Sequence, residues 1–306
     1  MKIQKRALIC LCVSAAIMLT AVVMSLCGFG INYGIDFAGG LNIQYNMGAA
    51  FDQADVETAL KNQGIAEYTV STSGENGHIL QVRVPSLNGE DEIQTLQNGL
   101  EAELSAKYTT MDTETATASY VGPIAGKVLV CNAVWSVVLA SALMLVYIAI
   151  RFDLSSGLAA VIGLLHDVLI MLSFMVILRS FVQMNSSFIA AMLTIVGYSI
   201  NNTIVIFDRI RENNRKAENA DVSRDVLVSV SVRECLGRTI NTTLTTLVTI
   251  VALYVLGVDA IREFSLPIII GILGGVYSAN LINGYVWAML EGLLKKRPAP
   301  KKAKKA

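Results

Sequence analysis

The sequence predicts a polytopic α-helical membrane protein that carries one small α+β domain outside the membrane, and three observations lead to this prediction. First, 54% of the 306 residues are hydrophobic and only 16% are charged, whereas a soluble domain of this size carries more charge. Second, six apolar runs are each long enough to cross a hydrocarbon core of about 30 Å. Third, residues 30–122 alternate in the manner of strands and amphipathic helices.

The apolar runs lie at 7–29, 127–150, 156–178, 187–207, 239–257 and 264–290. The first run follows Lys2, Lys5 and Arg6 and is too long for the apolar core of a cleaved signal peptide, so we interpret it as a retained transmembrane helix. With the N-terminus inside, 18 of the 24 Lys and Arg residues fall on the cytoplasmic side, as the positive-inside rule requires. The sequence therefore predicts that both termini are cytoplasmic.

Four segments follow from this layout: 1–29 is the cytoplasmic N-terminus and first helix, 30–122 the extracytoplasmic domain, 123–292 a bundle of five helices, and 293–306 a basic tail. The domain at 30–122 shows strands at 41–47, 67–73, 78–84 and 113–121, a turn at 74–77, and helices at 53–63 and 89–107. This βαββαβ order is typical of a ferredoxin-like module. Its thirteen acidic and three basic residues argue against nucleic-acid binding.

Two basic segments are expected at the cytoplasmic surface. Between the fourth and fifth runs, residues 208–237 carry Val226, Leu227, Val230 and Cys235 at near-helical spacing, which predicts an amphipathic helix lying on the membrane. The lysine-rich tail is interpreted as a solvated topology determinant that also touches the anionic headgroups of membrane lipid.

Polar side chains inside the fourth and fifth runs are the first candidates for an ion pathway. The helix of the fourth run carries Asn201, Asn202 and Asp208 on one broad face. The helix of the fifth run opens with a cation and continues as a stripe of hydroxyls: Arg238, Thr242, Thr245, Thr246 and Thr249. Since lipid leaves such groups unpaired, we expect the two polar faces to lie against each other. Interhelical hydrogen bonding without ion movement is the alternative explanation for the threonines.

His166 and Asp167 form a second candidate, because an adjacent imidazole and carboxyl deep in a transmembrane run are unusual. They predict either a proton-handling pair or a hydrogen-bonded structural pair. In the sixth run, a GxxxG from Gly271 to Gly275 predicts close helix packing. With two histidines, no CxxC and no nucleophile placed beside a base, the sequence predicts no metal site, no cofactor and no enzymatic activity.

Five stretches together resemble the SecF branch of the SecD/SecF family of protein-export membrane proteins. They are GIDFAGG at 34–40, VGPIAG at 121–126, YIAIRFDLSSGLAAVIGLLHDV at 147–168, VGYSINNTIVIFDRIREN at 196–213 and RTINTTLTTL at 238–247. The resemblance covers the chain nearly end to end.

The resemblance implies an auxiliary subunit of the Sec translocase in the bacterial cytoplasmic membrane. Its partners would be SecD, the translocon channel with its associated membrane subunits, and unfolded preprotein. The pair would form a twelve-helix unit related to resistance-nodulation-division transporters, driven by the proton or sodium motive force. Beyond the first helix, Gly34, Asp36, Gly39 and Gly40 are expected to form a turn or hinge between membrane and outer domain.

One position departs from the family pattern, which commonly has an aspartate where this chain has Asn202. An amide cannot exchange a proton, and three explanations remain: the relay runs through Asp167 or Asp208, the partner supplies the carboxylate, or coupling is weak or lost. We favour the partner. Two other functions stay open, an ion-coupled small-molecule exporter subunit and a structural stabiliser of the translocon. An exporter would usually have two repeats and larger outer domains.

Overall fold

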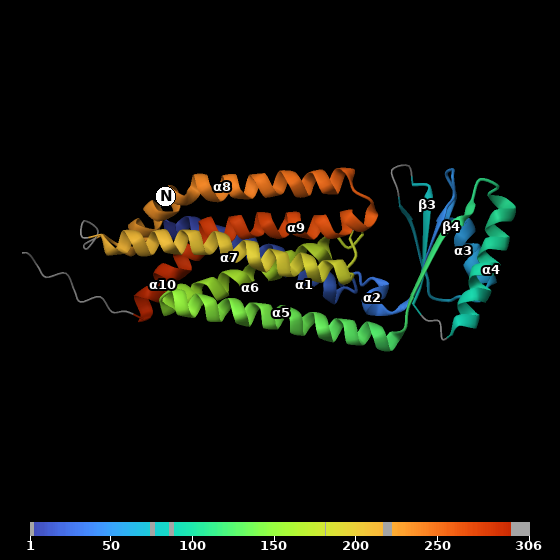
Figure 1. Cartoon of the computed structure of the whole chain (residues 1–306), viewed down its shortest axis with the longest axis horizontal. Helices are drawn as coiled ribbons and strands as arrows, with labels where there is room; N and C mark the ends of the chain where they lie inside the picture. Colours follow the sequence, from blue (N-terminus) through green and yellow to red (C-terminus); the bar gives the residue numbers. More distant parts are fainter. Residues whose placement is uncertain (1–2, 74–76, 86–88, 181, 217–221, 295–306) are drawn as a thin grey trace, which may run out of the picture.

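The computed structural model describes residues 3–73, 77–85, 89–180, 182–216 and 222–294, and its two parts meet end to end (Figure 1). One part is a bundle of long helices, and the other is a four-stranded sheet with two helices on its outer face. The described residues contain six helical segments that are long and apolar enough to cross a membrane. The chain is therefore a multi-pass membrane protein, as the composition predicts.

Each of the six predicted runs lies largely within one of these helical segments. They are α1 (Ile3–Leu26), α5 (Pro123–Arg151), α6 (Leu154–Ile177), α7 (Ser186–Arg215), α8 (Arg224–Leu256), and α9 (Asp259–Ser278), which continues through the π-helical turn η2 (Ala279–Asn283) into α10 (Gly284–Leu294). In α6 and in α7, half of the residues of the most apolar stretch are buried inside the protein, whereas the buried share of that stretch is 0% in α5 and 11% in α8. The outer sides of α5 and α8 therefore face lipid or another protein.

Glycines bring α9 close to α7, as the GxxxG spacing predicts. A Cβ added to Gly271 would collide with the side chain of Ile195, and one added to Gly275 would lie 3.3 Å from the Cα of Ser199. The absence of side chains on these two glycines lets the helix backbones approach, which maximises van der Waals contact where no hydrophobic effect drives helices together.

The second part of the chain contains β1 (Gly40–Asn46), α3 (Gln53–Asn62), β2 (Thr69–Ser73), β3 (Ile79–Val84), α4 (Glu90–Lys107) and β4 (Asp112–Val121). This is the order that the sequence predicts, with every boundary within two residues. The strands pair antiparallel in the order β2-β3-β1-β4. Residues 74–76 of the predicted turn lie outside the described residues.

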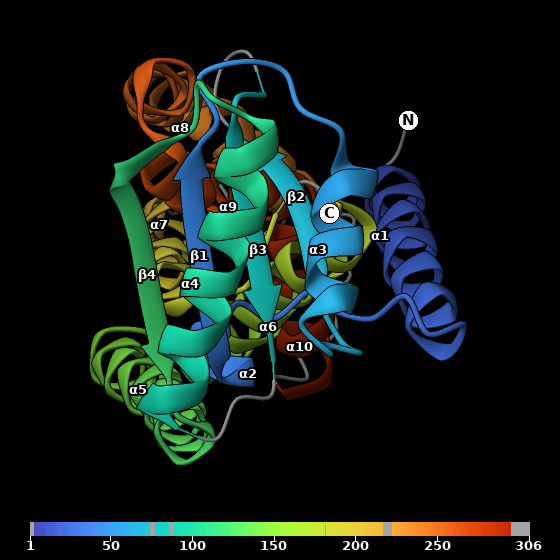
Figure 2. The ribbon, with the colours of Figure 1, turned by 90° about the vertical axis from the view of Figure 1, so that its right-hand side faces the viewer.

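Strand alternation gives the sheet one apolar and one polar face. Leu41, Ile43 and Tyr45 of β1 are fully buried and belong to the core under α3 and α4 (Figure 2). The intervening side chains of β1 and their partners on β3 form the opposite face, which is polar: Asn42, Gln44, Gln81 and Arg83. This polar face is turned toward the end of the helix bundle (Figure 1).

The prediction of a separate surface helix at 208–237 is wrong for the described residues. Residues up to Arg215 complete α7, and α8 begins at Arg224 and runs unbroken into the fifth membrane run. The reason is that Leu227, Val228 and Cys235 pack in the bundle core, while Val226 is 51% exposed. The apolar side of this segment therefore faces the neighbouring helices, not a membrane surface. Residues 295–306 of the predicted tail lie outside the described residues.

A short helix, α2 (Ile35–Ala38), joins α1 to the sheet and packs against the start of α5. Gly126 of α5 allows this contact, because a Cβ there would lie 3.0 Å from the carbonyl oxygen of Phe37. The chain thus enters and leaves the sheet domain at neighbouring points, as Figure 1 shows for α2 and α5.

Candidate functional site

A buried hydrogen-bond network surrounds Asp167 in the middle of the bundle. The carboxylate is 0% exposed and accepts hydrogen bonds from Ser199 of α7 and, at 2.8 Å, from Ser278 of α9. Its other oxygen lies 2.9 Å from Nδ1 of His166, and Nε2 of that ring lies 2.8 Å from the hydroxyl of Ser14 in α1. One acid and one imidazole therefore connect four transmembrane helices.

Tyr277 closes the network on the side of α1. Its hydroxyl donates to the carbonyl oxygen of Cys10 at 2.6 Å, and its ring is stacked beside that of His166 with centroids 6.4 Å apart. The sequence indicated His166 and Asp167 but did not indicate Ser14 or Tyr277 as partners. No periodicity distinguishes a single serine on an apolar helix from a packing residue, so only the fold could bring Ser14 into the site.

The two adjacent asparagines of α7 point in different directions. Asn202 is 4% exposed and faces the bundle interior, whereas Asn201 is exposed on the outside. Neither side chain has a hydrogen bond to another described residue. Beside Asn202, the hydroxyl of Thr203 accepts a hydrogen bond of 2.8 Å from the amide of Asn283, which lies in the π-turn η2. A Cβ on Gly163 of α6 would collide with that amide, so the glycine makes room for it.

The expectation that the hydroxyl stripe of α8 faces the asparagines within this chain is wrong for most of the stripe. Thr242, Thr245 and Thr249 are exposed, and only the half-buried Thr246 reaches α7, through a 3.5 Å contact with the hydroxyl of Tyr198. The threonine hydroxyls have hydrogen-bond acceptors within their own helix, since each donates to a backbone carbonyl three or four residues earlier.

Arg238 at the start of the stripe is exposed as well. Its guanidinium makes no hydrogen bond or ion pair with the described residues. Together with Asn201, Thr242, Thr245 and Thr249, it forms an outward polar surface of α7 and α8, which we call the α7/α8 polar face. In hydrocarbon such a surface is costly unless another protein or trapped water covers it.

Asp208, the last ion-pathway candidate on α7, lies at the end of the bundle away from the sheet. It is exposed and pairs with Arg151 at 3.6 Å. One residue further, Arg209 bridges Glu234 of α8 at 2.7 Å, so this end of the bundle is rich in ion pairs. The structure therefore does not bring Asp208 together with Asp167, which is enclosed in the middle of the bundle.

The glycines of the GIDFAGG stretch take two different roles. Gly39 and Gly40 have φ values of 77° and 112°, as the turn interpretation requires. Gly34 has φ −70° and is needed for space, because a Cβ there would lie 3.2 Å from that of Asn185. Asp36 accepts the backbone N–H of Ser186 at 2.7 Å, at the start of α7. This anchors α2 to the bundle, and motion about Gly39 and Gly40 stays a prediction.

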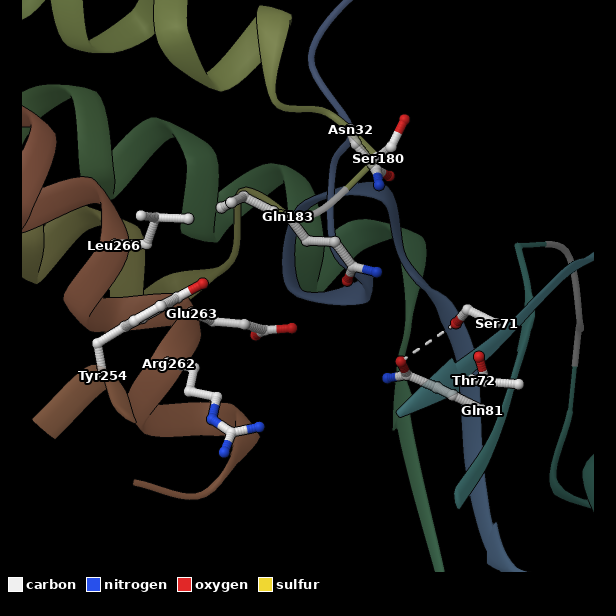
Figure 3. Close-up of a pocket in the computed structure, with 11 residues that line it drawn as sticks. Asn32, Ser71, Thr72, Gln81, Ser180, Gln183, Tyr254, Arg262, Glu263 and Leu266 are labelled. Carbon is white, nitrogen blue, oxygen red and sulfur yellow. Dashed lines mark hydrogen bonds between the residues drawn. The ribbon is translucent and has the colours of Figure 1, made fainter. Parts of the chain in front are cut away.

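A polar cleft of about 200 Å³ separates the sheet from the bundle (Figure 3). Ser71, Thr72 and Gln81 line it from the sheet, and Gln183 and Glu263 line it from the bundle. Nearby in β3, burial lowers the pKa of Arg83, and the negative charge of Glu263 opposes that shift. Opposite charges thus attract the sheet domain toward the bundle across this cleft.

Chemically, the buried network offers one carboxylate and one imidazole that can exchange a proton in a helix interior. Among the described residues, no group of three His, Cys, Asp or Glu side chains is close enough to hold a metal ion.

Comparison with known proteins identifies similar chains over almost the whole length. The family model described as protein export membrane protein SecD/SecF, C-terminal, matches residues 101–292, and that of the SecD/SecF GG motif matches residues 25–47. Protein translocase subunit SecF of Thermodesulfovibrio yellowstonii is 35% identical over 85% of this chain and 83% of its own length. SecF of Rickettsia felis is 34% identical over 88% of this chain and 87% of its own length.

Two further similarities are to longer proteins. Protein translocase subunit SecDF of Bacillus subtilis is 33% identical over 91% of this chain but only 36% of its own length. The crystal structure of SecDF from Thermus thermophilus, titled a translocon-associated membrane protein, superposes with a TM-score of 0.75 at 33% identity, over 94% of this chain and 38% of that one. The chain therefore spans little more than a third of each of these two SecDF proteins.

Proposed function

The chain belongs to the SecD/SecF family of protein-export membrane proteins, and we propose that it is a non-enzymatic accessory subunit of the Sec translocase. In this proposal it acts with SecD and the translocon channel to promote the passage of unfolded preprotein across the bacterial cytoplasmic membrane. The observation that carries the proposal is similarity over most of the chain to proteins named translocase subunit SecF. The relatives reported above are all translocase subunits, so nothing favours the small-molecule exporter.

We propose SecD as the partner on two grounds. First, the matched region makes up only 36% and 38% of the two SecDF relatives, so nearly two thirds of those proteins lie outside it. Second, the α7/α8 polar face has an exposed amide, guanidinium and hydroxyls at membrane depth. A second helical bundle laid on this face would remove these groups from lipid, and it could pair the amide of Asn201 and the guanidinium of Arg238, which have no partner among the described residues.

The network around Asp167 supports a role for the proton motive force, or for a sodium gradient. A carboxylate linked to four helices can change their packing when it binds a cation, because protonation removes the charge that Ser199, Ser278 and His166 stabilise. In this proposal Asp167 and His166 are the proton-handling pair of this chain, and the partner supplies the carboxylate that is missing at Asn202.

The orientation that we propose places the sheet domain outside the cytoplasm and both termini inside. The start of α1, the end of α5, the end of α7 and the start of α8 lie at the opposite end of the bundle from the sheet (Figure 1). These helix ends carry Arg6, Arg151, Arg209 and Arg233, as the positive-inside rule requires of the cytoplasmic side. The strand order β2-β3-β1-β4 and the two helices on one face support a ferredoxin-like architecture for the outer domain. Preprotein emerging from the channel would meet this domain.

Two measurements test the proposal. Purification of the chain from native membranes should recover SecD and channel subunits, whereas a self-sufficient homo-oligomer would contradict it. In inverted vesicles, collapse of the ion gradient should slow late preprotein translocation only when the chain is present. If the chain promotes translocation equally with and without a gradient, it is a structural stabiliser of the translocon, the alternative that Asn202 favours because an amide does not titrate.

A further inference from the structure

A cavity of about 540 Å³ opens at the arginine-rich end of the bundle, and none of its lining residues belongs to the network around Asp167. It lies between the start of α1, the start of α8 and the π-turn η2. Its lining combines cations with apolar side chains: Arg6, Ser229, Val232, Arg233, Leu236, Asn280 and Leu281.

The two arginines of this cavity differ from their neighbours in having no partner among the described residues. Arg151 and Arg209 at the same end of the bundle form ion pairs with Asp208 and Glu234. Arg6 and Arg233 form neither an ion pair nor a hydrogen bond to any residue that the structure describes. Two guanidinium groups from different helices thus line one cavity with their charge uncompensated, which favours an anion with several oxygen acceptors.

The amide of Asn280 on the inner wall of the cavity already has hydrogen-bond partners within the protein, so a ligand would be recognised mainly by the arginines. Asn280 accepts a hydrogen bond of 3.2 Å from Thr239 and donates one of 2.8 Å to the carbonyl of Val276. Asn280 and Leu281 both lie in η2, where the π-turn widens the helix beside α8. Beyond the arginines, the walls are formed by Leu236 and Leu281, which are 40% and 38% exposed.

The depth of the cavity fits the headgroup layer of a bilayer. Arg6 lies twenty residues before Leu26, the end of α1, and twenty residues of α-helix span about 30 Å. This equals the thickness of the hydrocarbon core, so Arg6 lies at one edge of it when Leu26 lies at the other. Apolar side chains then continue from the cavity toward the membrane centre on the exposed sides of α1 and α8: Ile9, Val13, Leu236 and Ile240.

The cavity and the α7/α8 polar face lie on opposite sides of α8. At 100° per residue, Arg233 is separated by about 120° and Leu236 by about 180° from Thr245 around the helix axis. A partner bundle that covers the polar face therefore leaves the cavity open. Lipid, which surrounds the rest of α1 and α8, is the occupant that can supply both an anionic head and an apolar body.

We propose that this cavity is a binding site for an anionic glycerophospholipid. Arg6 and Arg233 hold the lipid phosphate, with the hydroxyl of Ser229 as a further donor. The glycerol and first part of the acyl chains lie against Leu236 and Leu281. This follows the general rule that basic pockets between transmembrane helices on the positively charged side bind anionic headgroups. The site is independent of the proposed function in protein export.

Native mass spectrometry of the full chain, purified in detergent, tests the site with phosphatidylglycerol and phosphatidylcholine as probes. We expect one retained phosphatidylglycerol, with affinity reduced about fivefold by Arg6→Gln and about fivefold by Arg233→Gln. The control is Arg215→Gln, which removes the same charge from an exposed position at the end of α7, outside the cavity; it should leave the affinity unchanged. Ser229→Trp keeps both arginines but fills the cavity, and should also release the lipid.

Three results would overturn the proposal. Equal losses for Arg6→Gln, Arg233→Gln and Arg215→Gln would show general attraction to basic residues. Equal retention of phosphatidylcholine would show that the head carries no selectivity. Displacement by millimolar inorganic phosphate, with no requirement for acyl chains, would assign the cavity to a soluble anion instead of a lipid. Unchanged helicity in circular dichroism keeps each variant interpretable, and a misfolded arginine variant leaves Ser229→Trp as the deciding one.

Discussion

Replacing Asp167 by leucine or by asparagine separates the packing role of this side chain from a role in ion movement. Leucine has the same branched skeleton of four side-chain heavy atoms but no acceptor, so the hydroxyls of Ser199 and Ser278 lose their shared partner. Asparagine keeps an acceptor oxygen in nearly the same place, but it carries no charge and cannot exchange a proton. The two variants are therefore expected to fail in different assays.

The expected loss of stability follows from two interhelical hydrogen bonds. Such bonds inside membranes contribute about 0.6 kcal/mol on average and up to about 1.7 kcal/mol. Asp167→Leu removes one bond from α7 and one from α9, and we expect the free energy of unfolding to fall by roughly 1–3 kcal/mol. Asp167→Asn keeps one acceptor oxygen, so its loss should stay below about 1 kcal/mol.

Unfolding of the full chain in bicelles measures this difference. A double-mutant cycle with Ser199→Ala identifies the bond, because Ser199→Ala should cost much less in the Asp167→Leu background than in the native one. In vesicles that contain the chain, its partner and the channel, Asp167→Asn should remove the part of translocation that depends on the ion gradient. The part of translocation that does not depend on the ion gradient should be unchanged.

Two results would refute the reasoning separately. If Asp167→Asn responds to the gradient as the native chain does, the carboxylate takes no part in ion movement and is a structural acceptor. If Asp167→Leu unfolds with native free energy and shows no coupling to Ser199, the hydrogen bonds around it do not hold the helices together.

Three further predictions concern other parts of the chain. Asn202→Asp should change the ion dependence of translocation in reconstituted vesicles, and an unchanged dependence would exclude this position from the pathway. Gly40→Ala should destabilise β1 by more than the ~1 kcal/mol cost of a positive φ, because the added Cβ would collide with the carbonyl oxygen of Val84. Gly64 also has a positive φ, but no atom lies near its Cβ position, so Gly64→Ala should cost only about 1 kcal/mol. Hydrogen exchange measures both losses. Hydrogen bonds from Lys107 and Tyr108 lower the pKa of Asp55. The stability that these bonds contribute is therefore fully present above the ordinary carboxyl pKa and is lost as the pH falls through the lowered pKa of Asp55. Asp55→Asn should flatten this acid dependence, measured by hydrogen exchange of the backbone amides of α3.

The sequence predicted the spans and the sheet domain well because both depend on patterns within one segment. Twenty apolar residues require a span wherever they occur, and the alternation in ILQVRV at 79–84 requires a strand with one buried face. The positive φ of Gly39 and Gly40 was predicted for the same reason, since a paired glycine at a turn is a local signal.

Features that depend on several helices could not be predicted in the same way. Spacing puts Thr242, Thr245 and Thr249 on one side of α8, but it does not say whether that side meets α7 or the outside. Local bonds from these hydroxyls to the backbone remove the need for a partner within the chain. In the same way, Ser14 enters the candidate site only because α1 packs on α6, which no pattern along α1 indicates.

The central claim is that another helical bundle covers the α7/α8 polar face, and photo-crosslinking in native membranes tests it most directly. A benzophenone side chain at Thr245 should crosslink to SecD, while one at Ile240, about 140° away around α8, should crosslink mainly to lipid. Lipid adducts at both positions, with no protein partner at Thr245, would contradict the claim.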